Sequence, residues 1–170
     1  LRHRLSDPAA HEHYLQALGY LQRYENEASV DGAVTLLEGL LRSEGETAVV
    51  EAALGRAYLR KYRLTLERRW EEKAEAACER ALKLGPDSPD VRVTRGRLYS
   101  EVGRHGEAVD EFRRALRLRR DDLEAHLGLA MAYDKVGRFA EAERASALAV
   151  ALRPPFWAGY NQQGGTLFKQ

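Results

Sequence analysis

Cysteine is nearly absent from this chain of 170 residues, because Cys78 is the only one. No intrachain disulfide can form, and no Cys/His spacing is typical of a zinc site. No apolar run approaches the roughly 20 residues that a membrane-spanning helix needs. An excess of charge of one sign is also missing, since 27 Lys and Arg face 26 Asp and Glu. These absences exclude a disulfide scaffold, an inserted membrane helix and a uniformly basic nucleic-acid binder, so a partner must be selected by a local surface.

The sequence does contain an internal repeat, with a period of about 34 residues. Six residues of one copy, which are Gly96, Tyr99, Gly103, Ala108, Ala115 and Leu118, recur as Ala130, Tyr133, Gly137, Ala142, Ala149 and Leu152. We place the repeats at about 12–47, 48–88, 89–122 and 123–156, after a lead-in at 1–11 and before a partial repeat at 157–170. Because the chain starts at Leu1 without a methionine and stops inside a repeat, we expect it to be a fragment of a longer protein.

Each repeat is predicted to form two amphipathic helices joined by a short turn. Apolar residues recur at spacings of three and four, and a Gly-Arg pair separates two such runs in the best-matched repeats. Ser88 followed by Pro89 is typical of a helix start, and Asp122 can cap the next first helix. Neither helix of a pair can bury its apolar face alone, so the pairs must stack. The predicted fold class is therefore all-α, an α-solenoid of helix-turn-helix repeats.

Small residues are expected at the closest contacts between paired helices. At Gly55, Gly96 and Ala130 a large side chain would hold two backbones apart. We expect the facing surface of the second helix to be formed by alanines, namely Ala74, Ala108 and Ala142.

One segment, near 61–72, departs from the period. Tyr58 and Ala74 are separated by seven more positions than Tyr99 and Ala108, so this repeat has seven extra residues between its paired helices. They must either lengthen the helices or form a projecting loop. The basic and aromatic side chains in this insertion could clamp an anionic ligand. We favour the alternative, in which its tryptophan folds back over a neighbouring helix pair.

The pattern resembles the tetratricopeptide repeat family, whose unit of about 34 residues has a small residue and an aromatic in the first helix, alanines in the second and proline near the join. Pro86 and Pro154 occupy the join, while Gly45 and Arg120 stand where the family usually has proline. The resemblance covers nearly all of the chain from Glu12 onward. It implies a right-handed superhelix whose first helices line a concave groove that binds peptides or partner proteins.

The candidate groove residues lie on the first-helix faces opposite the packing stripes. They are Gln16, Tyr20, Arg23, Arg56, Arg60, Arg97, Glu101, Met131, Asp134, Lys135, Asn161 and Gln162, a set of mixed charge. Relatives that clamp the carboxylate tail of chaperones use polar residues where this chain has Val93, Thr94 and Leu127. We therefore argue against a chaperone-tail receptor and keep a peptide groove.

No set of residues predicts catalysis, a metal or a cofactor. His11 and His13 are two residues apart, which places them on different faces of a helix, and no third ligand accompanies them. Cys78 falls on an apolar helix face and is expected to be a small buried hydrophobe. The most basic segment, 111–120, alternates with apolar residues, which indicates an amphipathic helix with a solvated polar side. We predict no enzyme, no cofactor, no nucleic acid partner and no membrane insertion.

The leading functional hypothesis is a non-catalytic protein–protein interaction scaffold that binds a peptide or partner protein in the concave groove. An alternative is a regulatory segment of a larger signalling enzyme, because the segment 59–65 with the insertion, and the segment 153–161, are similar to repeat regions downstream of bacterial serine/threonine kinase domains. A third hypothesis is a homodimer formed through the partial repeat at 157–170, whose apolar face lacks a second helix. The default expectation for location is cytoplasmic.

Overall fold

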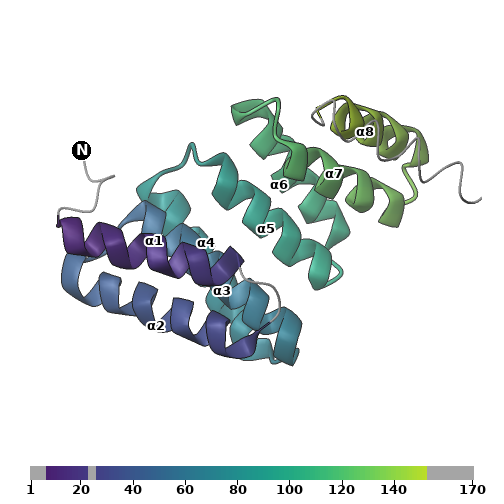
Figure 1. Cartoon of the computed structure of the whole chain (residues 1–170). Helices are drawn as coiled ribbons and strands as arrows, with labels where there is room; N and C mark the ends of the chain where they lie inside the picture. The colour runs from purple at the N-terminus through teal and green to yellow at the C-terminus, as the bar shows by residue number, and fades with distance from the viewer. Residues whose placement is uncertain (1–6, 23–25, 153–170) are drawn as a thin grey trace, which may run out of the picture.

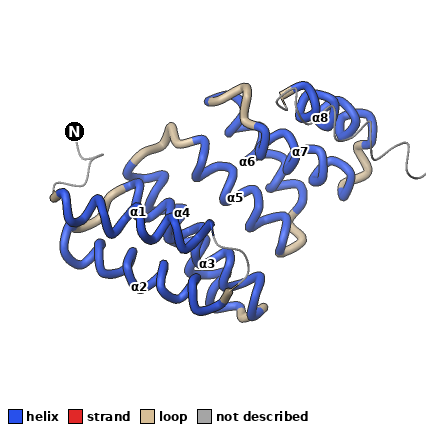
Figure 2. Tube along the Cα trace, viewed as in Figure 1, coloured by secondary structure: helices blue, strands red, loops and turns tan. Residues whose placement is uncertain are grey.

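The computed structural model describes residues 7–22 and 26–152, which form eight helices. The helices are α1 (Pro8–Gln22), α2 (Glu27–Glu44), α3 (Ala48–Thr65), α4 (Arg68–Leu84), α5 (Pro89–Glu101), α6 (His105–Leu118), α7 (Leu123–Lys135) and α8 (Phe139–Ala151). Figure 1 shows them as helix pairs that follow one another from the purple N-terminal pair to the yellow-green α8. The described part of the chain contains no strand, and Figure 2 shows only short loops between its helices. The predicted all-α repeat solenoid is confirmed.

Helix starts follow the predicted capping residues. Ser88 Oγ accepts a hydrogen bond from the Val91 amide at 3.4 Å, and Pro89 occupies the first turn of α5. Asp122 Oδ1 accepts one from the Ala125 amide at 2.9 Å and so caps α7. These acceptors satisfy amide groups that have no partner within the first helical turn.

The turns inside the last two helix pairs use glycine for its backbone freedom. Gly103 and Gly137 have φ angles of +80° and +77°, a left-handed region that costs other residues energy. The chain leaves α5 and α7 through these residues and enters α6 and α8 after one arginine, as the Gly-Arg pairs predict.

The seven extra residues of the second pair lengthen its helices. α3 and α4 have 18 and 17 residues, whereas α5 and α7 have 13 each. Only Leu66 and Glu67 lie between α3 and α4, and Leu66 ends α3 with a φ of +56°. Of the two alternatives that the sequence leaves open, the structure therefore has longer helices rather than a projecting loop.

Trp70, at the start of α4, packs onto its own helix pair. Its ring stacks on Tyr58 of α3 at a centroid distance of 5.8 Å. Lys61 Nζ lies 5.5 Å from the Trp70 ring centroid and forms ion pairs with Glu27 at 2.8 Å and Asp31 at 2.7 Å. The extension of α3 thus ties the second pair to α2 of the first, and the charge of this lysine is already neutralised.

The small residues of the first helices do lie at close contacts. A Cβ built on Gly55 would be 2.7 Å from Cys78 Sγ, and one built on Gly96 would be 2.8 Å from Phe112 Cε1. The side chains that meet these glycines are thus Cys78 and Phe112, one helical turn beyond the alanines that the sequence suggested, Ala74 and Ala108. The small side chains of Ala74 and Ala108 leave space beside the glycines, and the side chains four positions later, Cys78 and Phe112, fill it.

Contacts between the helix pairs determine which side of the solenoid is concave. Each first helix contacts its own partner, the second helix of the preceding pair and also the preceding first helix, so that α1, α3, α5 and α7 form one continuous row. Within the ranges that the structure describes, the backbones of the second helices α2, α4, α6 and α8 do not approach one another, and α2 and α4 are joined only through the long side chains of the Lys73–Glu38 ion pair. Because successive first helices lie against one another while the backbones of the second helices stay apart, the row of first helices lies on the inner side of the curve.

Candidate binding groove

One face of α3 runs along the middle of this inner surface, between α1 and α5. Residues at spacings of three and four, from Val49 through Ala52, Arg56 and Arg60 to Arg63, line two adjoining hollows that share Arg56. A third, smaller hollow of about 170 Å³ connects Arg56 to α5 and α7. We call this surface the α3 groove.

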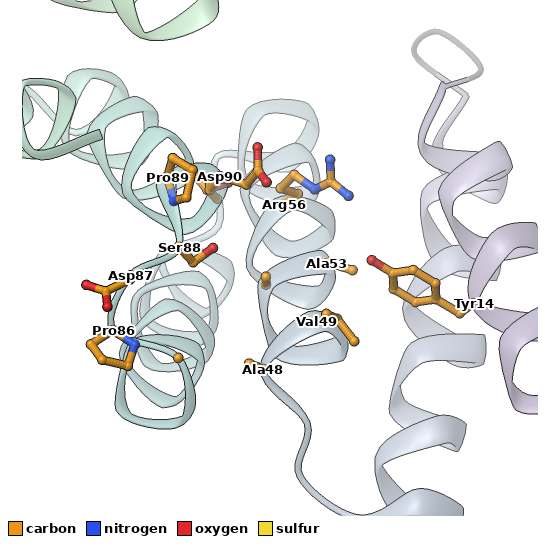
Figure 3. Close-up of a pocket in the computed structure, with 13 residues that line it drawn as sticks. Tyr14, Ala48, Val49, Ala53, Arg56, Pro86, Asp87, Ser88, Pro89 and Asp90 are labelled. Carbon is orange, nitrogen blue, oxygen red and sulfur yellow. Dashed lines mark hydrogen bonds between the residues drawn. The ribbon is translucent and has the colours of Figure 1, made fainter. Parts of the chain in front are cut away.

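The hollow at the beginning of α3 is mostly apolar and has a volume of about 530 Å³. Val49, Ala52 and Ala53 form its floor, and Pro86 of the loop before α5 and Pro89 of the first turn of α5 lie along one side. Figure 3 shows Tyr14 reaching from α1 toward α3 on the opposite side from the residues 86–90. The alanine, valine and proline side chains suit an apolar group, while Asp87, Ser88 and Asp90 add polar atoms on the side of the α4–α5 loop.

Two polar groups of this hollow, the Tyr14 phenol and the Asp90 carboxylate, lie near arginine side chains. Partial burial raises the pKa of the Tyr14 phenol, and the nearby Arg56 charge only partly opposes that effect. The phenol therefore stays protonated and can donate a hydrogen bond at neutral pH. Asp90 is bound by Arg119 at 2.6 Å, so its charge is already compensated.

The hollow at the end of α3 is basic and has a volume of about 300 Å³. Four arginines, Arg56, Arg60, Arg63 and Arg97, line it together with two glutamates. Leu18 and Leu21 of α1 and Leu59 of α3 supply its apolar wall. The α3 groove thus changes along its length from apolar to positively charged.

The glutamates of the basic hollow form only solvent-exposed ion pairs. Glu101 pairs with Arg63 at 3.4 Å and Glu124 pairs with Arg97 at 3.0 Å, and each of these side chains is at least two-fifths exposed. Exposed pairs of this kind are worth about 0–1 kcal/mol, so a ligand carboxylate can replace them at little cost. Arg56 forms no ion pair with any described residue.

The structure brings some of the predicted groove residues together and not others. Arg56, Arg60, Arg97 and Glu101 meet in the basic hollow. Met131 lies two turns beyond Glu124 on α7 and is 68% exposed, so it continues the same inner row beyond the hollows.

The remaining predicted residues lie elsewhere or cannot be placed. The Tyr20 ring packs over Gly32 of α2, and Gln16 donates a hydrogen bond to the Tyr20 hydroxyl at 3.4 Å, so both belong to the α1–α2 side. Asp134 and Lys135 are exposed at the end of α7 and line none of the hollows of the α3 groove. The other three, Arg23, Asn161 and Gln162, lie outside the described residues, as does the partial repeat at 157–170.

Several groove residues were missed from the sequence. Val49 and Arg63 lie seven residues before and after Arg56, so the same helical stripe that identified Arg56 could have included them. Tyr14, Leu18 and Glu124 had no such signal, because the first repeat is degenerate and the groove depends on how neighbouring helices pack.

The structure also places the other residues that the sequence analysis considered for chemistry. Burial raises the pKa of the Cys78 thiol to about 12, which keeps it protonated and unreactive at neutral pH. Across residues 7–22 and 26–152 no three His, Cys, Asp or Glu side chains gather as a metal site would require. None of the helices within those ranges is both long and apolar enough to cross a bilayer. Arg69 of the segment 61–72 pairs with Glu67, and Lys73 just after that segment pairs with Glu38, so both positive charges are compensated.

Comparison with known proteins matches part of the chain to a repeat family. Residues 101–155 match the tetratricopeptide repeat family. A thermophilic TPR protein of Thermus thermophilus superposes with a TM-score of 0.77 at 23% identity, covering 96% of this chain and 82% of that chain. MamA AMB-1 superposes at 0.64 with 23% identity, covering 88% and 82%.

A third solved structure contains a peptide. It is the second TPR domain of human RPAP3 in complex with the HSP70 peptide SGPTIEEVD, with a TM-score of 0.55 and 20% identity, covering 72% of this chain and 97% of that chain. No curated protein matches the chain. These likenesses support the fold and the repeat, while the groove has to be judged from its own residues.

Proposed function

We propose that this row of stacked helix pairs, of which residues 101–155 match the tetratricopeptide repeat family, is a non-catalytic scaffold that binds an extended peptide segment of a partner protein in the α3 groove. The observation that carries the proposal is the adjoining pair of hollows on one face of α3, which together offer an apolar cavity and a basic one. Stacked helical repeats commonly bind partners on their concave surface.

The residues of the groove favour a peptide over other ligands. A small cofactor would need a closed pocket with convergent polar groups, whereas these hollows are open and lie end to end along a helix. Thr94 is buried and its hydroxyl donates to the Asp90 carbonyl of its own helix at 2.9 Å, so it is not available to a terminal carboxylate. Val93 is buried as well, which supports a ligand other than a chaperone tail.

Charge reversal in the groove should abolish peptide binding. We expect peptides selected from a random display library on the full chain to lose binding at least tenfold in the double variant Arg56→Glu, Arg97→Glu. Both side chains are exposed, so the substitutions place negative charge on the groove without disturbing the core. Fluorescence anisotropy of the labelled selected peptides measures the loss.

The matched control is Arg113→Glu, Arg117→Glu on α6, which makes the same change of charge outside the α3 groove. We expect this control to bind the selected peptides as the unmodified chain does, with the same far-UV circular dichroism for all three proteins. Equal affinity of the two double variants, whether both weak or both unchanged, would remove the α3 groove from the proposed function.

A further inference from the structure

We infer that the α3 groove recognises an internal acidic segment of its partner, with one apolar side chain in the Tyr14–Val49–Pro89 cavity and carboxylates on alternate residues against Arg56, Arg60 and Arg63. This inference rests on the proposed function and specifies the chemistry of its ligand. It requires no chain terminus, unlike a clamp that binds a terminal carboxylate.

The excess of positive charge in the basic hollow favours a ligand with negative charge. Four arginines face two glutamates there, and both glutamates are engaged in exposed ion pairs. Arg56, which stands where the two hollows meet, has no ion-pair partner among the described residues. An acidic ligand would complement this excess and would bind more tightly at low ionic strength, whereas a basic one would be repelled.

The spacing of the arginines determines the spacing of the carboxylates. Arg56 and Arg60 are four residues apart on α3, which corresponds to about 6 Å along a helix axis. Two residues of an extended chain cover about 6.6 Å, and residues two apart point to the same side. Acidic residues at every second position of an extended ligand therefore match Arg56 and Arg60, and Arg63, about 4.5 Å further along the axis, lies within reach of the next acidic residue.

The apolar hollow determines where the apolar side chain of the ligand lies relative to its acidic residues. Its floor lies around Val49–Ala53, about 7 Å before Arg56 along the axis, which is again two residues of extended chain. From Val49 to Arg63 the groove is about 21 Å long, enough for roughly six extended residues. The ligand pattern that fits is an apolar residue with acidic residues two, four and six positions away, in one chain direction or the other.

Designed peptides test this pattern on the full chain. The probe is a fluorescein-labelled decapeptide of serine and glycine that contains one leucine followed by glutamates two, four and six positions later, with acetylated and amidated ends. A second probe has the reverse order. A third has the same composition with the leucine moved by one position, so that it points away from the glutamates. A fourth carries lysine in place of glutamate, and a fifth replaces the leucine by serine.

We expect one of the two ordered probes to bind at least tenfold more tightly than the displaced-leucine, lysine and serine probes. We also expect Arg56→Gln to weaken that probe about fivefold or more, while Arg113→Gln on α6 leaves its affinity unchanged. Equal binding of the ordered and displaced probes would overturn the spacing argument. Tighter binding of the lysine probe would overturn the inferred acidic ligand. Displacement of the ordered probe by a single-stranded oligonucleotide at lower concentration than by unlabelled peptide would also overturn it.

The library selection separates this inference from the proposed function. If the selected peptides are neutral or basic but still depend on Arg56 and Arg97, the groove binds peptides and only the inferred chemistry fails. If no selected peptide depends on these two arginines, both fail together.

Discussion

Replacement of Gly128 by alanine is expected to lower the free energy of unfolding by about 2–3 kcal/mol, the usual cost of forcing an extra carbon into a packed core. A Cβ on Gly128 of α7 would overlap the ring of Phe112 from α6. The ring has no free space to move into, because the side chain is 1% exposed and a Cβ built on Gly96 of α5 would also be only 2.8 Å from it. Phe112 therefore joins three helices through two glycines.

Urea unfolding followed by circular dichroism measures this effect. The control is Gly19→Ala in α1, where a Cβ meets nothing within 4 Å. Since alanine favours the helix over glycine, the control should gain about 0.5–1 kcal/mol. Adding Phe112→Leu to Gly128→Ala should recover part of the loss, because the smaller side chain leaves room for the new methyl group. A Gly128→Ala protein as stable as the Gly19→Ala protein would contradict the packing described above.

The second large effect is expected for Arg80→Met, which should cost about 3 kcal/mol by leaving a buried carboxylate unpaired. Glu51 of α3 is 1% exposed, and both its oxygens accept hydrogen bonds from Arg80 of α4, at 2.7 and 3.0 Å. No other basic side chain in the described part of the chain forms an ion pair with this carboxylate.

The matched control is Arg114→Met, at the equivalent position one repeat later. Arg114 binds the buried Glu111 at 2.9 Å, but Glu111 also pairs with Arg92 at 3.1 Å and Arg95 at 3.9 Å. Its loss should cost about 1 kcal/mol or less, because the carboxylate keeps two partners. Replacing both Glu51 and Arg80 by methionine should restore much of the stability lost by Arg80→Met alone. Equal losses for the two arginine variants in urea unfolding would contradict this account of the buried pair.

Much of the fold follows from local signals in the sequence. Ser88 and Asp122 cap helices because their side-chain oxygens reach nearby amides, an interaction within three residues of the chain. Gly103 and Gly137 permit left-handed turns that few other residues adopt. The fixed period then repeats these signals, so the pairing of helices is predictable before any packing is known.

Packing details depend on shape rather than on pattern. The sequence identified Gly96 as a close contact, but not that Phe112 would fill the space or that Gly128 would receive its other side. Nor could it decide between a loop and longer helices around residue 66, since the structure ends α3 at Leu66 in a conformation that favours glycine.

The candidate groove was predictable where the repeat is regular. Arg56, Arg60 and Arg97 were identified because a fixed period fixes the inner face of α3 and α5. Tyr20 was predicted to line this surface, but its ring packs over Gly32 of α2. The first repeat is degenerate, so its period does not fix how α1 is rotated about its own axis. Leu18 and Leu21 line the basic hollow instead.

The central claim is that a partner's chain lies along the inner face of the first helices. The direct measurement is nuclear magnetic resonance of the isotope-labelled chain of 19.2 kDa, titrated with a selected library peptide. We predict that the amide shifts that move most belong to the inner faces of α1, α3 and α5, around Tyr14, Arg56 and Arg97. Shifts confined to the outer helices α2, α4 and α6 would contradict the claim.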